Sequence, residues 1–213
     1  MIMPLLSAFA IVMSAATLAA QPAPTVAGPA RSDLAALKGA TIAVDPGHNG
    51  GNASATAYIN HKVPAGGFMK ECDTTGAETD DGSLTEAAFN WDVARRLRNL
   101  LKASGAKVVM TRKGNSGVGP CINRRAQIGN HAGADVAISI HADGGPPEGS
   151  GFHLIRPGVI PGYTRAIVAP SGRLALDVRA ALDASGHHRA DYIAHNGLDR
   201  RTDLGGLNLS KVP

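Results

Sequence analysis

Residues 41–51 read TIAVDPGHNGG, and the rest of the chain is organised around this segment. Its first four residues are apolar and mostly β-branched, and the chain then breaks at Asp-Pro-Gly, which predicts a short buried strand ending in a sharp turn. His48 therefore follows the carboxyl end of this strand. Ligands bind at that end of the strands in open α/β sheets, and a neutral imidazole is a common metal ligand. The alternative interpretation is a surface histidine in a glycine-rich loop.

Two further strands are predicted downstream, with helical segments between them. Residues 107–111 read KVVMT, and residues 135–145 read DVAISIHADGG, a run so apolar that it indicates a central strand covered on both faces. The second of these strands also delivers a histidine, His141, to its carboxyl end. Alternating strands and helices predict parallel pairing, so His48 and His141 are expected at the same edge of the sheet.

The strongest helical pattern begins at Ser83, and Glu86 in its first turn has two interpretations. Ser-x-x-Glu is a capping box with Ser83 as the N-cap, which gives Glu86 a purely structural role. Helical spacing instead places Glu86 on the inward face, where a carboxylate is costly unless it pairs with a cation or a metal. The apolar residues predicted for that face are Phe89, Val93, Leu97, Leu100 and Leu101.

Together, these segments predict a metal site. Two histidines at strand ends and a carboxylate at the start of the intervening helix, namely His48, Glu86 and His141, form a set of two nitrogen ligands and one oxygen ligand. Catalytic zinc sites have three such protein ligands and leave the fourth position to water. The sequence therefore predicts one zinc ion.

The remaining segments complete an α/β pattern. Helices are predicted at residues 123–132 and 171–184, and further strands at 151–156 and 192–194. The inward residues predicted for the second helix are Leu174, Val178, Ala181 and Leu182. Residues 49–83 form a long polar loop, of a length that is usually functional or disordered. We expect solvated or packing roles for its His61, Glu71 and Glu78 and for the other histidines: His131, His153, His187, His188 and His195. Arg124 and Arg125 are either surface charges or, for one of them, an inward brace.

The amino-terminal region has the features of a leader. Residues 1–28 carry no charged side chain, and residues 5–20 are small and apolar, which predicts a signal peptide over residues 1–20 with cleavage near Ala19 or Ala20. Because no Lys or Arg precedes the apolar run, an uncleaved anchor is the alternative. Residues 21–37 read as a linker and short lead-in. We therefore expect an exported protein in the periplasm, in the cell wall or outside the cell.

Charge and cysteine content agree with export. The chain of 213 residues has 21 basic and 17 acidic residues, all from Arg31 onward, and a pI near 9.3. This excess suits an anionic partner such as a cell-wall polymer or lipid headgroup, whereas no aromatic interleaving or basic helix indicates nucleic acid. The two cysteines, Cys72 and Cys121, lie in loop-like segments without metal-type spacing, and in an oxidising compartment they predict a disulfide.

With these residues identified, the sequence resembles a known family, the zinc-dependent N-acetylmuramoyl-L-alanine amidases (amidase type 3) of bacterial cell-wall turnover. The resemblance covers roughly Gly39 to the last residue. The segments that carry it are VDPGH at 44–48, Glu86 with Asn90, VMTR at 109–112, Arg125 with Asn130, and SIHA at 139–142. It implies that His48, Glu86 and His141 are the zinc ligands. It also implies a single α/β domain with a mostly parallel central sheet of about six strands and helices on both faces.

The resemblance further implies an activity, the hydrolysis of the amide between N-acetylmuramic acid and L-alanine in peptidoglycan. In this chemistry, zinc lowers the pKa of its bound water toward about 7, and a carboxylate handles the proton. The family's carboxylate is a glutamate in a Pro-x-x-Leu-x-Glu-type segment of the last strand, and Pro213 matches that proline. We therefore expect a catalytic domain at residues 38–213 that lacks the last strand, contains no catalytic glutamate and has little activity.

The alternative function is a catalytically inactive zinc-containing module that binds peptidoglycan. For either function, the expected partner is peptidoglycan or a muropeptide. We expect no nucleic acid, no stable membrane span after cleavage, and a monomer.

Overall fold

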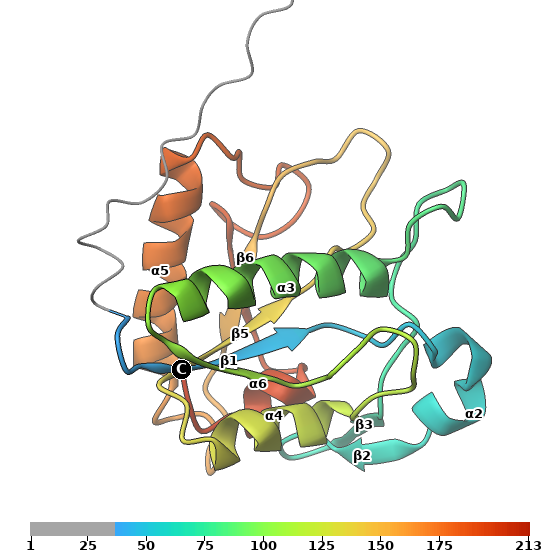
Figure 1. Cartoon of the computed structure of the whole chain (residues 1–213), viewed down its shortest axis with the longest axis horizontal. Coiled ribbons are helices and arrows are strands. Elements are labelled where there is room, and N and C mark those ends of the chain that lie inside the picture. Colours follow the sequence, from blue (N-terminus) through green and yellow to red (C-terminus); the bar gives the residue numbers. More distant parts are fainter. Residues whose placement is uncertain (1–36) are drawn as a thin grey trace, which may run out of the picture.

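The computed structural model describes residues 37–213, and the predicted signal peptide and most of the linker lie outside the described residues. Its centre is a parallel sheet of three strands in the order β4-β1-β5, in which Ile42 is the register partner of Val108 and Val136. These strands are β1 (Thr41–Pro46), β4 (Lys107–Met110) and β5 (Val136–Ile140). Helix α3 (Glu86–Ala103) covers one face and α4 (Ile122–His131) the other (Figure 1). The predicted α/β class with parallel strands and helices on both faces is confirmed.

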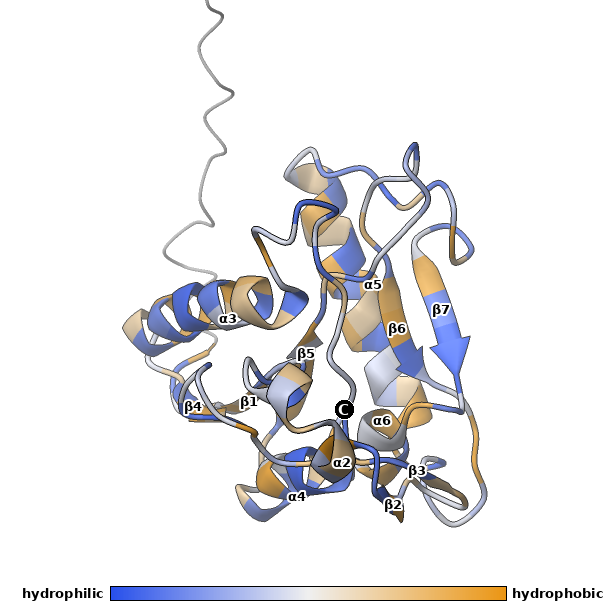
Figure 2. Cartoon of the chain, turned by 90° about the vertical axis from the view of Figure 1, so that its right-hand side faces the viewer, coloured by the Kyte–Doolittle hydropathy of each residue, from blue (hydrophilic) through white to orange (hydrophobic). Residues whose placement is uncertain are grey.

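Smaller elements surround this sheet. The predicted loop 49–83 contains a 3-10 turn, a short helix and a hairpin: η1 (Asn52–Ser54), α2 (Thr56–Ile59), β2 (Lys62–Pro64) and β3 (Met69–Glu71). A second parallel pair consists of β6 (Leu154–Pro157) and β7 (Leu198–Arg201), with α5 (Val168–Ala184) packed on β6 and α6 (Gly205–Leu209) packed on α4 (Figure 2). Among residues 37–213, no helix combines the length and apolar character needed to cross a membrane.

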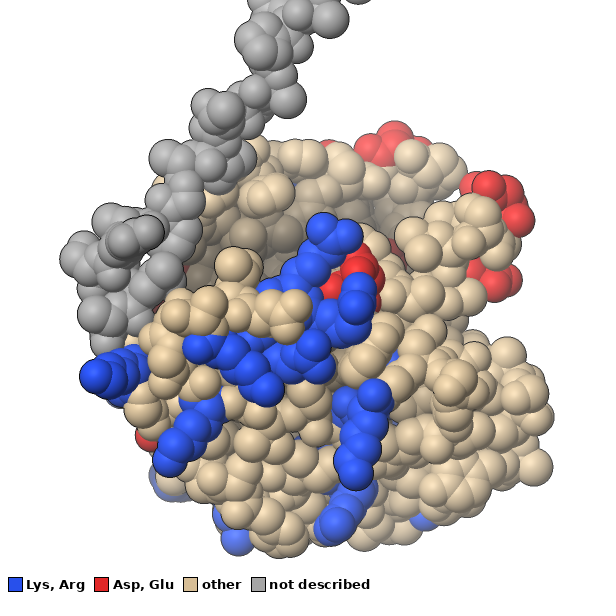
Figure 3. All heavy atoms as spheres, in the orientation of Figure 1, with Lys and Arg blue, Asp and Glu red and all other residues tan. Residues whose placement is uncertain are grey.

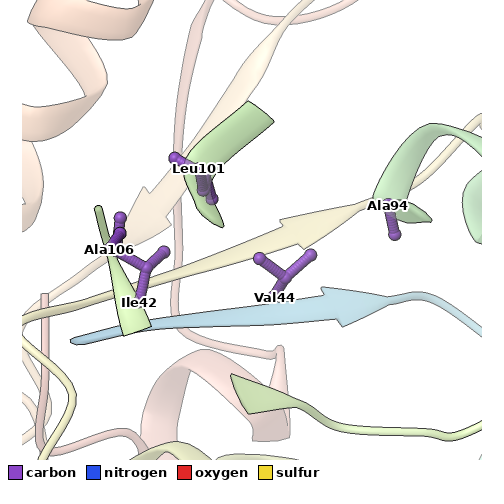
Figure 4. Close-up of a cluster of buried hydrophobic side chains, with 5 residues drawn as sticks. All are labelled: Ile42, Val44, Ala94, Leu101 and Ala106. Atoms are coloured by element: carbon purple, nitrogen blue, oxygen red, sulfur yellow. The ribbon is translucent and has the colours of Figure 1, made fainter. Parts of the chain in front are cut away.

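The core lies between β1 and α3 (Figure 4). Its buried residues are Ile42, Val44, Ala94, Leu101 and Ala106, and Leu97 and Met110 pack against them. Ala94 on α3 and Val44 on β1 are both fully buried in this cluster, so a small side chain forms part of the contact between helix and sheet. This close contact brings the first turn of α3 to the end of β1, where the predicted site residues lie.

The structure corrects the start of α3. The helix begins at Glu86, and Thr85 is its N-cap because its hydroxyl accepts a hydrogen bond from the N–H of Ala88 at 3.3 Å. Ser83 instead hydrogen-bonds Asp81 in the preceding turn. The capping-box interpretation of Glu86 is therefore wrong, because the cap lies two residues later than predicted.

The inward face of α3 is also narrower than predicted. Its buried residues are Glu86, Ala87, Asn90, Ala94 and Leu101, whereas Phe89 and Leu100 are 41% and 68% exposed. Small and polar side chains occupy the interface between α3 and the sheet, because the helix lies close to the sheet and its first turn faces the predicted metal site. Helical spacing placed Glu86 correctly on the inward face but assigned Phe89 and Leu100 to the wrong side.

Two differences concern the C-terminal third. The predicted strand at 192–194 is absent, because Ala194 and Asn196 have φ of 67° and 56°, and the chain turns there before β7 begins at Leu198. Helix α5 begins at Val168 rather than near residue 171, and Ala181, predicted to face inward, is exposed.

Candidate metal centre

The turn after β1 brings two histidines together. His48 adopts a left-handed conformation with φ of 58°, which reverses the chain directly after the strand. Its neighbour Gly47 lies against the imidazole of His141, and a Cβ on Gly47 would fall 2.3 to 2.7 Å from three atoms of that ring. Because real Cβ atoms do not approach so closely, only glycine allows the His141 ring to lie beside this turn.

His48, Glu86 and His141 form one cluster. Nε2 of His48 lies 3.3 Å from Oε2 of Glu86, and Nδ1 of His141 lies 2.9 Å from Oε1 of the same carboxylate. The two imidazole rings are 5.0 Å apart, and one ligand atom from each of the three residues lies within 4.8 Å of the others. Glu86 is 5% exposed, whereas the His141 side chain is 42% exposed. The cluster is thus anchored on its inner side and open on its outer side.

The charges in this cluster are coupled. Burial raises the pKa of Glu86, but hydrogen bonds from His141, His48 and the Ala77 N–H outweigh burial and hold the pKa far below its usual range. Burial lowers the pKa of His48, but hydrogen bonds to Asp73 and Glu86 raise it to about 9. Without metal, His48 is therefore a cation at neutral pH, and it must release a proton to become a ligand.

Asp73 orients His48. The Nδ1 of His48 lies 3.1 Å from Oδ1 of Asp73 and 3.2 Å from the Thr74 carbonyl oxygen. A carbonyl can only accept, so Nδ1 carries a hydrogen, and Nε2, which faces Glu86, is the nitrogen that becomes a ligand once it has released its own proton. A carboxylate behind a histidine in this way is the usual support of a metal ligand. Burial raises the pKa of Asp73, but its hydrogen bond with His48 and the charge of Arg125 outweigh burial, so the pKa lies below its usual range.

Arg125 is the inward brace, whereas Arg124 is exposed. Arg125 is 5% exposed and donates hydrogen bonds to Asp45 (2.8 Å) and Asp73 (3.3 Å). It also donates to the carbonyl oxygens of Pro46 and His48, both at 2.8 Å. One guanidinium thus joins the end of β1, the turn at His48 and the segment that contains Asp73.

Asp45 completes this buried network. Its carboxylate also accepts hydrogen bonds from the hydroxyls of Thr111 at 2.6 Å and Ser139 at 2.9 Å. Burial raises the pKa of Asp45, but the charge of Arg125 and these hydrogen bonds outweigh it, so the pKa lies below its usual range. Asp45 thereby ties together the ends of the three central strands.

A second buried arginine supports the same turn. Arg112 is 4% exposed and donates to the carbonyl oxygens of Pro46 at 3.0 Å and Ala87 at 2.8 Å, while its guanidinium lies 5.1 Å from the centre of the Trp91 ring. Burial and the neighbouring charge of Arg125 lower its pKa to about 10, so it remains a cation at neutral pH. Arg112 therefore connects the turn after β1 to the first turn of α3.

The disulfide links the two segments that carry Asp73 and Arg125. Cys72 and Cys121 are joined, with their Cα atoms 4.4 Å apart. Asp73 directly follows the first cysteine, and α4, which carries Arg125, begins directly after the second. The bridge therefore places the carboxylate that orients His48 beside the arginine that stabilises it.

The comparisons with known proteins agree with this geometry. Residues 42–213 match the sequence model of the family described as N-acetylmuramoyl-L-alanine amidase. The chain belongs to this family. An N-acetylmuramoyl-L-alanine amidase of Mycobacterium tuberculosis is 38% identical to it over 178 residues, which cover 83% of this chain and 71% of that protein.

Two solved structures show the same fold. The apo form of an N-acetylmuramyl-L-alanine amidase from Mycobacterium abscessus is 41% identical, with a TM-score of 0.76, and the match covers 83% of this amidase and 81% of that chain. An amidase from Mycobacterium smegmatis is also 41% identical, with a TM-score of 0.78 and coverage of 83% and 80%.

A hollow of about 180 Å³ opens beside the cluster of this amidase. Its walls include Glu86 itself, the apolar side chains of Leu84 and Phe89, and the acidic side chains of Glu78 and Asp143. Exposure of Leu84 and Phe89, at 43% and 41%, leaves apolar surface next to the predicted metal ligands. A substrate with both apolar and polar groups fits such a wall.

The other residues considered from the sequence have different positions. Glu71 pairs with Lys62 in the β2–β3 hairpin, in agreement with a solvated role. His61 is exposed and lies near the two cysteines, but their sulfurs are joined to each other and do not offer thiolates. Glu78 is exposed, as predicted, and it also lines the hollow beside Glu86.

The supporting roles of three residues, Asp73, Asp45 and Arg112, were not predicted from the sequence, although Asp45 and Arg112 lie in segments that carry the family resemblance. The position of Asp73 directly after a cysteine was the available signal for it. For Arg112, the signal was its position directly after the second predicted strand, at the same sheet edge as His48.

Proposed function

We propose that this amidase is a zinc-dependent hydrolase that cleaves the amide between N-acetylmuramic acid and L-alanine in peptidoglycan. The observation that supports this proposal is the cluster of His48, Glu86 and His141, whose ligand atoms lie within 4.8 Å of one another in a chain of the amidase family. Two imidazoles and one carboxylate match the donor set of catalytic zinc, and the exposed side of His141 leaves access for water and substrate.

The residues of the chain prepare this site. Zinc, when bound, supplies an acidified water and polarises the scissile carbonyl. Asp73 holds the proton of His48 on Nδ1 and so directs Nε2 toward the metal side, where it can bind after losing its proton. The N–H groups of Ala77 and Ala142 donate to the two oxygens of Glu86 at 2.8 and 3.0 Å and hold the carboxylate in place. Preorganised ligands of this kind reduce the reorganisation that metal binding requires.

A proton must also pass from the water to the leaving amine. Glu86 serves as a ligand in this proposal and is therefore not free for that role. Besides Glu86, the carboxylates that line the hollow are Glu78 and Asp143. General acid–base catalysis contributes about 10²–10⁴-fold, so the loss caused by Glu78→Gln or Asp143→Asn measures whether either residue acts.

The second candidate function is a zinc-containing module that binds peptidoglycan without cleaving it. It is favoured by one observation: both oxygens of Glu86, the carboxylate inside the cluster, are engaged by histidines and backbone N–H groups. This carboxylate is therefore not free to take a proton from water. Zinc content and peptidoglycan binding without release of stem peptides would support this second function.

Metal analysis and product analysis test the proposal together. We expect about one zinc per chain in the purified protein and a sharp loss of zinc in His48→Ala and His141→Ala, whereas His131→Ala, an exposed histidine on α4, is the matched control. Mass spectrometry of digested peptidoglycan should show stem peptides with a free L-alanine amine, abolished by a chelator and restored by zinc. Full zinc binding by both site variants would refute the ligand assignment.

We also propose export of the protein to the periplasm, the cell wall or the medium. The family's substrate and the disulfide support this location, and basic side chains gathered over α3 suit an anionic environment (Figure 3). We propose a signal peptide at residues 1–20, a linker at 21–37 and a monomeric catalytic domain at 38–213. Amino-terminal sequencing of exported protein should start near residue 20, and intact Met1 on exported protein would support the anchor instead.

A further inference from the structure

A second hollow, of about 340 Å³, lies between β6, β7 and α5. It shares no residue with the zinc cluster or with the hollow beside Glu86. Figure 2 shows its region at the edge of the molecule, where β7 is largely hydrophilic and lies beside β6 and α5. The amidase reaction as proposed does not use this hollow.

Three arginines from three different elements line it. Arg156 on β6 and Arg200 on β7 are register partners, so their side chains leave the same face of the parallel pair. Arg179 comes from α5, two turns after Gly172, and a Cβ on Gly172 would lie 3.7 Å from Nη1 of Arg156. The guanidinium of Arg156 thus reaches the helix that carries Arg179, and the three cations surround one space.

These arginines lack the partners that their neighbours have. Within residues 37–213, no carboxylate lies within 4.0 Å of a nitrogen of Arg156, Arg179 or Arg200, and Arg179 donates only to the Asn196 carbonyl oxygen, at 3.2 Å. Nearby Arg189 and Arg201, in contrast, both pair with aspartates. Like charges on directly adjacent strand positions destabilise a sheet. An anion bound between Arg156 and Arg200 would reduce this electrostatic repulsion.

The lining also contains one acidic residue. Asp199 contributes to the wall, but its carboxylate lies 3.8 Å from Arg201 and is partly neutralised there. Three arginines and one aspartate leave two positive charges in excess, and His195 in the wall adds a ring N–H donor. The net charge of the hollow therefore favours an anion.

We propose that this hollow binds a phosphate group, free or as the phosphate ester of a small alcohol or sugar. The planar fork of arginine binds phosphate through two parallel hydrogen bonds, and three such forks suit its several oxygens. A volume of about 340 Å³ is at the small end of ligand pockets and accommodates phosphate with a glycerol-sized or sugar-sized substituent. The site would tether the protein to phosphate-bearing wall material independently of amide cleavage.

Titration calorimetry of the 213-residue protein with inorganic phosphate tests the proposal, at constant ionic strength set with chloride. We expect saturable binding of one phosphate, weakened about tenfold or more in Arg156→Gln and in Arg200→Gln, because each removes a charge-assisted contact. Arg124→Gln, which removes an equal charge from an exposed position on α4, is the matched control and should bind as the unaltered protein does.

Further measurements distinguish phosphate binding in this hollow from binding through zinc and identify the source of the phosphate. His141→Ala should still bind phosphate, which excludes binding through zinc and keeps this result independent of the proposed amidase function. Glycerol phosphate binding without binding to phosphatidylglycerol vesicles would identify a soluble or polymer ester as the source, and the reverse would identify a lipid headgroup. Equal weakening in Arg124→Gln, equal affinity for acetate, or no saturable binding would overturn the proposal.

Discussion

Replacing Arg125 by methionine tests the buried network that supports His48. The change keeps much of the side-chain volume but removes the guanidinium that contacts Asp45 at 2.8 Å and Asp73 at 3.3 Å. Both carboxylates then remain buried without their cation, and breaking a buried ion pair in this way costs about 3–5 kcal/mol. With a urea m-value of about 2 kcal/mol/M, the unfolding midpoint should fall by about 1.5–2.5 M.

The pH dependence distinguishes this cause from lost packing. In the unaltered protein, the folded-state pKa values of Asp45 and Asp73 lie below their unfolded values, so their stabilisation is present at neutral pH and is lost as the pH falls through the folded values. In Arg125→Met, both folded pKa values should rise. The destabilisation should therefore be largest near pH 7 and shrink below about pH 4, where the two carboxylates that have lost their arginine partner accept protons.

Urea unfolding followed by circular dichroism at pH 4 and pH 7 measures both effects. Arg124→Met is the matched control on the same helix, and we expect its stability to change by less than about 0.5 kcal/mol because that side chain is exposed. A loss in Arg125→Met that equals the control, or one that is the same at both pH values, would refute the argument.

Four further predictions concern the site and the disulfide that supports it. Zinc affinity, measured by competition with a chelator, should rise about tenfold per pH unit between pH 6 and 8, because His48, with a pKa near 9, must lose its proton on binding. Asp73→Asn should lower that affinity about 10–100-fold at pH 7, and an unchanged value would mean that Asp73 does not orient the ligand. Gly47→Ala should reduce zinc content while a cooperative melt persists, because the added Cβ meets the His141 ring; full zinc occupancy would contradict the close approach. Replacing both bridged cysteines by alanine should destabilise the fold by about 4 kcal/mol for a loop closed over 49 residues, and an unchanged melting temperature would show that the bridge adds nothing.

Local sequence patterns were sufficient to predict the central strands and the three residues of the cluster. Apolar runs that end in turns define β1, β4 and β5, and the parallel pairing that follows from strand–helix alternation places their carboxyl ends together. His48 and His141 were therefore expected at one edge, and helical spacing placed Glu86 in the first turn of the intervening helix on its inward side, although the predicted N-cap, Ser83, lay two residues too early. These conclusions depend on local patterns, which a sequence displays directly.

The residues that support the cluster, in contrast, depend on how the elements pack and could not be predicted from local patterns. Arg124 and Arg125 are adjacent and chemically identical, and the packing of α4 against β1 determines which of them is buried. The roles of Asp73 and Arg112 likewise depend on contacts between segments far apart in the chain. The exposed position of Phe89 has the same origin, because the close approach of α3 to the sheet selects small inward residues such as Ala94. Sequence periodicity reports which side chains are apolar, whereas the distance between packed elements decides which of them fit.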